Sequence, residues 1–368
     1  MEIPFHNRDR LYAQYAEEIN SVVQKIFSSG QVLMGPLVAE FEEKIAQYCG
    51  RKFACSVSSC TDALFFALKA ADVGEGDEVL VTSFSFIASA SCILRAGAIP
   101  VFVDINADDF MMDLESAKQC LSKKTKAVIG VHLFGQSLPA KEWEEFTVKH
   151  NLIFIEDAAQ SLGSQFQNRR VGQMGLISCL SFDPTKVLGA FGTGGAVLTD
   201  DRKIYSILKK FRYHGKDEKN DDFEILGYNS RMTTLQAALL NLQMKWLDRW
   251  IAQRQSIAQG YTDRLKDIEG LVSPSIRLGS KHIFHKYVLK TTRRDELKKY
   301  LEGQGIAAMI HYPHALYEYG VFKKYYTSKM PLATVNKIKT EVLSLPIYPE
   351  LEASEIEYIV DSIRKFYQ

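Results

Sequence analysis

Cysteine is sparse in this chain and confined to one part of it. Six cysteines occur among 368 residues, and none lies beyond position 179. No two of them have the Cys-x-x-Cys spacing; they are Cys49, Cys55, Cys60, Cys92, Cys120 and Cys179. This distribution argues against a disulfide framework and against a zinc cluster. It favours a reducing compartment such as the cytosol.

A charge excess of either sign is also missing. The chain has 45 Lys and Arg residues against 44 Asp and Glu residues, which gives a net charge of +1. Without a basic field we expect no nucleic-acid partner. The pairs Lys123-Lys124 and Lys209-Lys210 are interpreted as solvated surface rather than as binding patches.

No long hydrophobic run is present. The most apolar region, 84–103, is interrupted by Arg95, whereas a membrane span needs about 18 or more uncharged apolar residues. The first residues, Met1 to His6, lack the apolar core of a signal peptide. We therefore expect a cytoplasmic protein with no membrane partner.

The chain does contain a regular alternation of strand-like and helix-like segments. It is 46% hydrophobic and 24% charged, as in an ordinary globular protein, and is long enough for two domains. The alternation predicts an α/β fold with a mostly parallel sheet and helices on both faces. The expected helices are 10–28, 37–49, Thr61–Ala71 and Ile87–Ala96; the expected strands are Ala54–Val57, Glu78–Thr82, Pro100–Val103, Ala127–Val131, Leu152–Ile155, Ile177–Phe182 and Gly195–Leu198.

The second half of the chain predicts a smaller appended unit. The polar region 213–230 is expected to be a loop. One long helix should follow, because Leu235, Leu239, Leu242, Trp246 and Trp250 keep helical spacing. Beyond it, a strand at 285–289 and helices at 294–304 and 353–366 predict an α+β domain. We place a large domain at 1–250 and a small C-terminal domain at 251–368.

Two residues with complementary chemistry follow expected strands. Lys186 comes shortly after the strand 177–182, and Asp157 comes after the strand 152–155. Ligands of parallel sheets bind beyond the carboxyl ends of the strands. Pyridoxal 5'-phosphate (PLP) requires a lysine amine that condenses with its aldehyde and an aspartate that keeps its pyridine nitrogen protonated. The sequence therefore predicts a PLP site with these two catalytic residues. A P-loop is a weaker interpretation, because its glycines precede the lysine and here they follow it.

Other parts of such a site also have candidates. The segment 58–62 lies between a strand and a helix, where free N–H groups favour phosphate, although a plain helix cap is the commoner use of such a segment taken alone. Ser181 could add a hydroxyl group to this cup. Phe86 could stack on the pyridine ring, and Gln160 could donate a hydrogen bond to the ring hydroxyl. Taken alone, an aromatic residue in an apolar run is usually part of a core.

Several segments in the same order resemble the DegT/DnrJ/StrS family of PLP-dependent sugar aminotransferases. The resemblance runs nearly from end to end. It rests on Ser29-Gly30 to Gly35-Pro36, Ser58–Leu64, Phe84–Ser89, Pro100–Asp104, His132–Gly135, Glu156–Ser161, Ser181–Gly195, Gly227–Met232 and His311-Tyr312-Pro313.

The resemblance implies the architecture of fold type I and a homodimer with sites shared across the interface. It assigns imine formation to Lys186, the ring nitrogen to Asp157, the ring hydroxyl to Gln160 and ring stacking to Phe86. It assigns phosphate binding to Cys60, Thr61 and Ser181. It also implies that Asn229 reaches the phosphate bound in the neighbouring subunit. L-glutamate is the implied amino donor, leaving as 2-oxoglutarate, and a ketosugar, by the family's default a nucleotide-linked one, is the implied acceptor.

The chain departs from the family pattern at positions that bear on the sugar. Asp183 stands where His or Tyr is common, and Tyr317 stands where many members have His. Both are expected to face the substrate, together with His311 and Tyr312. Three further departures, at Cys60, Val187 and Thr193, leave the chemistry at the lysine unaffected. We expect no metal, because Pro313 interrupts the pair His311 and His314 and no carboxylate or cysteine lies at ligand spacing.

Two other functions remain open at this point. A PLP-dependent sugar dehydratase of the same fold replaces the lysine with histidine, whereas this chain keeps Lys186. A PLP-binding regulatory protein without turnover would keep the fold but has no need of Lys186, Asp157 and Gln160 together. We therefore expect an aminotransferase of amino-sugar biosynthesis, for a surface polysaccharide, lipopolysaccharide or secondary metabolite.

Overall fold

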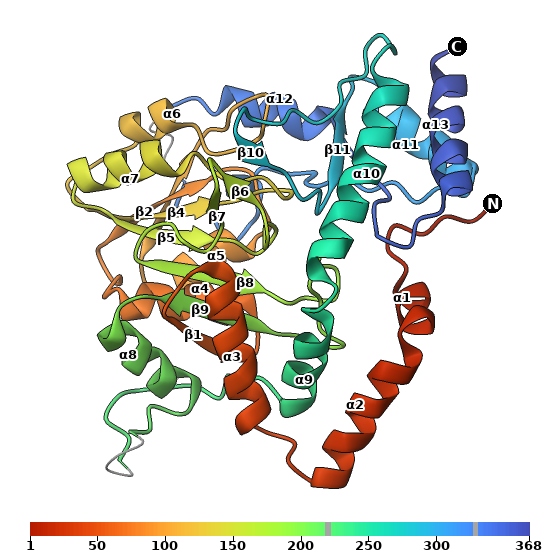
Figure 1. Ribbon diagram of the computed structural model, residues 1–368. Helices are drawn as coiled ribbons and strands as arrows, with labels where there is room; N and C mark the ends of the chain where they lie inside the picture. Colours follow the sequence, from red (N-terminus) through yellow and green to blue (C-terminus); the bar gives the residue numbers. More distant parts are fainter. Residues whose placement is uncertain (218–221, 327–329) are drawn as a thin grey trace.

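The computed structural model describes residues 1–217, 222–326 and 330–368 (Figure 1). Its centre is a seven-stranded sheet in the order β1-β9-β8-β5-β4-β2-β3. The pairs from β3 across to β8 are parallel, and β9 runs antiparallel to both β8 and β1. The strands are β1 (Phe53–Val57), β2 (Glu78–Thr82), β3 (Ile99–Val103), β4 (Thr125–Val131), β5 (Ile153–Asp157), β8 (Ile177–Ser181) and β9 (Gly195–Thr199). The expected α/β sheet is confirmed.

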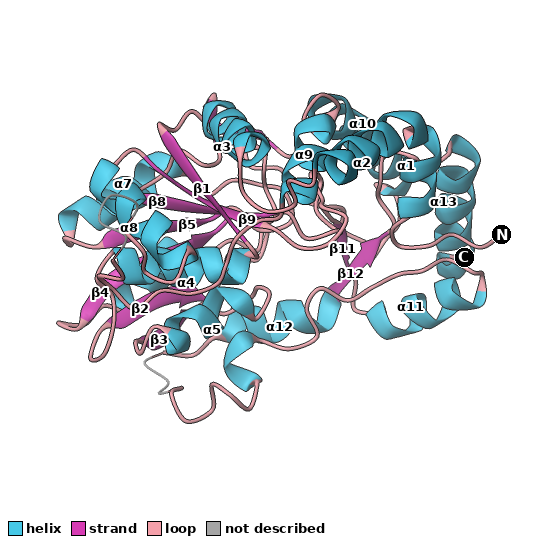
Figure 2. Cartoon of the chain, turned by 90° about the horizontal axis from the view of Figure 1, so that it is seen from below, coloured by secondary structure: helices cyan, strands magenta, loops and turns pink. Residues whose placement is uncertain are grey.

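Helices cover both faces of this sheet (Figure 2). One face carries α4 (Cys60–Ala70), α5 (Ala88–Arg95) and α8 (Arg202–Arg212); the other carries α3 (Pro36–Cys49), α7 (Ala140–Lys149) and α9 (Thr234–Gln243). A short helix, α6 (Leu114–Gln119), lies between β3 and β4 in the chain. Successive strand residues point to opposite faces of the sheet, and helices bury both faces. The strands are therefore apolar on both sides, as in other sheets with helices on both faces.

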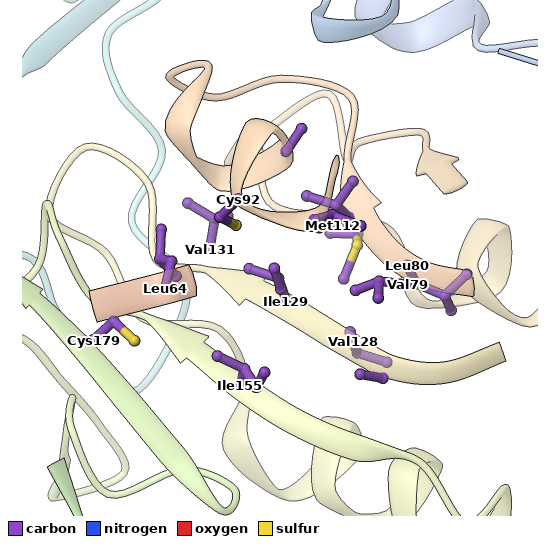
Figure 3. Close-up of a cluster of buried hydrophobic side chains, with 14 of the residues drawn as sticks. Leu64, Val79, Leu80, Cys92, Met112, Val128, Ile129, Val131, Ile155 and Cys179 are labelled. Atoms are coloured by element: carbon purple, nitrogen blue, oxygen red, sulfur yellow. The ribbon is translucent and has the colours of Figure 1, made fainter. Parts of the chain in front are cut away.

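The core between the sheet and α4 fixes the edge at which ligands bind. Ile129 of β4 and Ile155 of β5 are direct register partners, and Leu64 of α4 and Cys92 of α5 lie near them (Figure 3). All four side chains are buried, and burying an aliphatic side chain of this size contributes about 1.5–3 kcal/mol. This packing holds the first turn of α4, which follows β1, at the same edge as the carboxyl ends of β5 and β8.

The C-terminal part has a core of its own. It contains α10 (Leu247–Leu265), β11 (Tyr287–Lys290), α11 (Arg294–Gly303), β12 (Val342–Leu345) and α13 (Ala353–Tyr367). Ile3 from the N-terminal end joins this core, whereas η1 (Leu316–Glu318) and α12 (Ala333–Glu341) pack on the core of the large sheet. The division at residue 250 stays a prediction. A further small sheet combines β6 (Gln165–Phe166), β7 (Arg169–Arg170) and β10 (Ser280–Lys281).

Two expected long helices are each broken into two. The segment 10–28 forms α1 (Arg8–Gln14) and α2 (Ala16–Ser29), separated by Tyr15. The ring of Tyr15 is buried and stacks on Trp246 with centroids 3.8 Å apart. Trp246 itself lies at the second break, between α9 and α10. The apolar residues keep helical spacing through both breaks, so the sequence predicts continuous helices. The tertiary stacking of Tyr15 on Trp246 instead accompanies a break at each of the two residues.

The region 213–230 contains only isolated bridges where it is described; 218–221 lie outside the described residues. Within the described ranges, no helix combines the length and the apolar character needed to cross a membrane.

Candidate active site

A cavity of about 540 Å³ opens beyond the carboxyl ends of β5 and β8. Most of the residues predicted from the sequence line it. They are Cys60, Thr61, Phe86, Asp157, Gln160, Ser181, Asp183, Lys186, His311 and Tyr312. The structure thus brings together side chains from positions 60 to 312 at one edge of the sheet.

Lys186 lies in the loop that follows β8. Its backbone N–H donates to the carbonyl of Asp183 over 2.9 Å, which closes a tight turn. Burial lowers the pKa of the Lys186 ammonium, and the carboxylate of Asp183 acts in the opposite direction. A lowered pKa increases the fraction of neutral amine, which is the nucleophilic and basic form.

Asp157, the last residue of β5, is buried at the wall of the cavity. Its carboxylate accepts hydrogen bonds from the Ser89 hydroxyl over 2.7 Å and from the Ala159 N–H over 3.2 Å. Burial raises the pKa of Asp157, and these two donors offset that only in part. No described residue forms an ion pair with Asp157. A buried carboxylate in this condition fits a protonated ring nitrogen, whose positive charge would compensate it.

The preceding residue, Glu156, points to the opposite face and has a full set of protein partners. It accepts from the N–H groups of Gly172 and Met174 over 2.7 and 3.1 Å. The Ser178 hydroxyl donates to it over 2.5 Å. His132 Nδ1 accepts from a backbone N–H, so its Nε2 carries the proton and donates to Glu156 over 2.8 Å. Burial alone raises the pKa of Glu156, but these donors hold it below its usual value.

The first turn of α4 has free backbone N–H groups of the kind that a phosphate site needs. The Ser59 side chain accepts from the N–H of Asp62 over 3.1 Å, so the helix-cap interpretation is correct for Ser59. The first backbone hydrogen bond of the helix is donated by Ala63, which leaves the N–H groups of Cys60 and Thr61 directed beyond the helix end. The two interpretations are therefore compatible, since the cap and the cup use different N–H groups.

Gly195, the first residue of β9, allows the cup to sit against the sheet. A Cβ atom at this position would lie 2.5 Å from the backbone carbon of Ser59 and 2.6 Å from the nitrogen of Cys60. Both are backbone atoms and cannot rotate away. The glycine-rich stretch after Lys186 therefore permits the backbone of β9 to lie directly against the backbone of Ser59 and Cys60.

Gln160 and Tyr312 are joined at the cavity wall. The Gln160 carbonyl accepts from the Phe134 N–H over 3.1 Å, and its amide donates to the Tyr312 hydroxyl over 3.0 Å. The first bond fixes which end of the amide faces the cavity. Phe86, which also lines the cavity, keeps more than half of its surface exposed. Such an exposed aromatic ring has a free face for stacking.

Two predicted site residues lie elsewhere. Tyr317 stacks on Tyr326 and donates to Asn336, so its ring is directed away from the cavity; Tyr319 lines the cavity in its place. Asn229 is exposed and accepts hydrogen bonds from Arg231. The role of Asn229 toward a neighbouring subunit is a prediction that a single chain leaves untested.

Three basic residues of the cavity were missed by the sequence analysis, namely His6, His285 and Lys286. His6 belongs to the N-terminal segment, which is tied into the C-terminal part through a bridge between Ile3 and Ile306. No local pattern marks that contact. His285 and Lys286 open the segment 285–289, which we expected to be a strand. Among the described residues, no group of three or more His, Cys, Asp or Glu side chains is arranged to hold a metal ion.

A half-buried lysine and a buried aspartate that face one cavity, next to free N–H groups at a helix end, fit the requirements of a PLP enzyme. The comparisons with known proteins place it more narrowly. A family model matches residues 13–364, and the chain belongs to the DegT/DnrJ/EryC1/StrS aminotransferase family.

Two relatives illustrate the range of the family. The chain is 38% identical over 370 residues to a pleiotropic regulatory protein from Geobacillus stearothermophilus, covering 100% of this chain and 99% of the relative. It is 34% identical to the dTDP-3-amino-3,4,6-trideoxy-alpha-D-glucose transaminase of Micromonospora megalomicea subsp. nigra, covering 96% of each.

Solved structures agree. The S. venezuelae DesV structure in complex with a ketimine intermediate has a TM-score of 0.96 at 32% identity and covers 100% of this chain and 99% of its own. NtdA from Bacillus subtilis with bound pyridoxamine phosphate (PMP) has a TM-score of 0.92 at 28% identity. The match covers 99% of this chain and 85% of that chain. The protein is a PLP-dependent aminotransferase with the expected fold.

Proposed function

We propose that this enzyme transfers the amino group of L-glutamate to the ketone of a nucleotide-linked sugar. The observation that carries the proposal is the placement of Lys186 and Asp157 at the ends of paired strands around one cavity. Support for the sugar comes from relatives named as dTDP- and UDP-sugar aminotransferases, including a UDP-2-acetamido-2-deoxy-3-oxo-D-glucuronate aminotransferase of Pseudomonas aeruginosa. The product would be an amino sugar for a polysaccharide, lipopolysaccharide or secondary metabolite.

Each catalytic residue has a defined task in this proposal. PLP, when bound, supplies an aldehyde and an electron-accepting ring. Lys186 Nζ would hold the cofactor covalently at rest and, once released by the donor, would take the proton from the donor α-carbon. The lowered pKa of Lys186 suits it to that work. The Asp157 carboxylate keeps the proton on the ring nitrogen, and Ser89 orients that carboxylate.

The other site residues bind and orient. The N–H groups of Cys60 and Thr61, with the Ser181 hydroxyl, would hold the phosphate. Phe86 would cover one face of the ring, and Gln160 would donate to the ring hydroxyl. Asn229 would complete the phosphate site of a second subunit, which makes the enzyme a homodimer. All six cysteines are buried, and none of them forms a disulfide with another described residue, which supports a cytoplasmic enzyme.

The sugar would contact a different set of side chains. Asp183 lies at the cavity with its carboxylate accepting from the hydroxyl and N–H of Thr185. Burial alone raises the pKa of Asp183, but these bonds hold it low, so the residue stays ionised and can accept from sugar hydroxyls. His311 and Tyr312 also line the cavity. Tyr317 is better placed for structural packing than for substrate.

The test of the proposal begins with absorbance. The PLP-loaded enzyme should be yellow and should lose that colour when L-glutamate is added. It should then aminate one or more members of a panel of dTDP- and UDP-linked ketosugars and release 2-oxoglutarate stoichiometrically. Failure of every amino donor to change the spectrum would refute the proposal. Borohydride reduction followed by peptide mapping should place the pyridoxyl label on Lys186.

A regulatory role is the second candidate, because the Geobacillus relative is named as a regulatory protein. A binder of PLP without turnover would also be yellow. It would stay yellow in every amino donor, so the same absorbance experiment separates the two functions.

A further inference from the structure

A second lysine lines the cavity from a different part of the chain. Lys286 comes directly before β11, and its backbone N–H donates to the carbonyl of Phe134 over 3.2 Å. Its side chain is only 6% exposed. The task assigned to Lys186 does not need a second amine, so the position of Lys286 requires its own explanation.

The neighbours of Lys286 are a ring and an imidazole rather than an acid. The ammonium lies 4.7 Å from the centroid of the Phe5 ring and 3.5 Å from His6 Nε2. Burial and the nearby Lys286 lower the pKa of His6 to about 3, so that imidazole is neutral. In the described part of the chain, no carboxylate lies within ion-pair distance of Lys286. At close range its charge therefore meets only the quadrupole of Phe5 and dipoles, while the Asp183 carboxylate acts on it from farther away.

A buried cation in this condition favours an anionic ligand. Burial lowers the pKa of Lys286 to about 7, with Lys186 and Arg254 acting in the same direction and Asp183 against them. Bringing a carboxylate beside the ammonium would recover part of the desolvation cost, because a paired buried charge costs less than a single one.

An unpartnered buried atom lies in the adjacent residue. His285 is 2% exposed and lines the same cavity. Its Nδ1 has no hydrogen-bond partner among the described residues. Buried polar atoms are nearly always paired in folded proteins. The cavity does not reach that nitrogen, so the ammonium of Lys286, rather than the imidazole of His285, is the group left for an anion in the cavity.

We propose that Lys286, beside His285 in the cavity wall, forms a subsite for a carboxylate of the amino donor. The assignment rests on the aminotransferase function proposed above. A terminal carboxylate is small enough to reach a nearly enclosed ammonium. The diphosphate of a nucleotide sugar lies in the middle of a long molecule, with bulky groups on both sides, and needs an open groove. The subsite therefore binds the donor, and the sugar nucleotide uses the more exposed part of the cavity near Asp183.

The two half-reactions test this assignment separately, because donor and sugar enter in turn. Lys286→Met removes the charge at nearly constant length, and Lys286→Arg restores a charge. Loss of a charge-assisted hydrogen bond should lower the second-order rate of conversion of the PLP form by L-glutamate about 10- to 100-fold. The rate of the PMP form with the ketosugar should stay unchanged. Lys281→Met, at an exposed lysine on β10, is the matched control.

Binding without chemistry provides a second readout. Glutarate has two carboxylates but no amine, so its dissociation constant with the PLP-loaded enzyme reports anion recognition alone. Lys286→Met should weaken glutarate about 10-fold or more, while pyrophosphate binding stays unchanged. Lys286→Arg should bind glutarate more tightly than Lys286→Met. Thermal unfolding should show no loss of stability in Lys286→Met, because the variant removes a buried charge.

Each result decides the question. Unchanged glutarate binding in Lys286→Met overturns the subsite. A loss confined to pyrophosphate or to the ketosugar half-reaction also overturns it and assigns Lys286 to an anionic group of the sugar. Failure of the wild-type enzyme to react with L-glutamate refutes the proposed function instead, and the glutarate measurement still shows whether Lys286 binds a carboxylate.

Discussion

Glu156 and Asp157 are neighbours at the end of β5, and both carboxylates are buried. Glu156 is surrounded by donors from the protein, namely a histidine, a serine and two backbone N–H groups. Asp157 has two donors and faces the cavity. The pKa of Glu156 is held low and that of Asp157 is raised. Burial alone does not distinguish the two acids, whereas the supply of hydrogen-bond donors does.

The difference assigns a separate role to each face of the strand. On the face of Glu156, a saturated carboxylate ties β5 to the turn at 172–174 and to β8. On the face of Asp157, the carboxylate retains capacity for a positively charged partner. A buried acid that the protein satisfies completely belongs to the fold, and one that the protein leaves partly unsatisfied is available to a ligand. The following predictions test this distinction.

The largest effect should come from Lys186 on the ligand face. Lys186→Ala removes both the covalent attachment and the base, so turnover should be undetectable; general base catalysis alone is worth about 10²–10⁴-fold. Steady-state release of 2-oxoglutarate measures it. The variant should still fold, because the side chain that it removes is only partly buried and lies at the cavity rather than in the core. Substantial turnover would mean that another residue holds the cofactor.

Exchange of the two acids by their amides should separate catalysis from structure. Asp157→Asn should lower kcat by about 100-fold or more, because the ring nitrogen loses its acid partner. Glu156→Gln should leave kcat within a few-fold of wild type in protein that is still folded, since Glu156 does not line the cavity. The cofactor spectrum confirms that each variant is loaded. Equal losses of kcat would remove the distinction between the two faces.

The sequence was sufficient to predict the position of those site residues whose signal lies in the neighbouring residues of the chain. Lys186 and Asp157 each follow a recognisable strand, so their meeting at one edge follows from parallel pairing. Lys286 and His6 could not be found in the same way, because they reach the cavity through contacts between distant segments. The break at Tyr15 also escaped prediction, since stacking on Trp246 is a tertiary contact. Tyr317 was misplaced because a resemblance fixes the position of a segment more firmly than the direction of a side chain.

Stability should respond in the opposite order from activity. Glu156→Gln should lower the free energy of unfolding by about 1–3 kcal/mol, because the amide –NH2 replaces one acceptor oxygen and leaves buried donors without a partner. Asp157→Asn should leave the stability of the cofactor-free protein unchanged or higher, since it removes a carboxylate that burial penalises. Thermal or urea unfolding of the cofactor-free proteins measures both. A larger loss in Asp157→Asn than in Glu156→Gln would contradict the comparison.

The smallest effect should appear in the pH dependence of unfolding. The folded-state pKa of Glu156 lies below its ordinary value of 4.5, so its contribution to stability is present above pH 4.5 and is lost as the pH falls through the folded pKa. The folded-state pKa of Asp157 lies above its ordinary value of 3.8, so its penalty is present at neutral pH and disappears as the pH falls through that raised pKa.

Opposite signs make these two contributions separable. Between pH 7 and pH 3.5, Glu156→Gln should lose less stability on acidification than the wild type, and Asp157→Asn should lose more, each by an amount on the order of 1 kcal/mol. Unfolding temperatures of the three cofactor-free proteins across this range give the slopes. Parallel curves for all three would show that neither carboxylate titrates differently in the folded state. The contrast between the faces of β5 would then rest on geometry alone, without an electrostatic consequence.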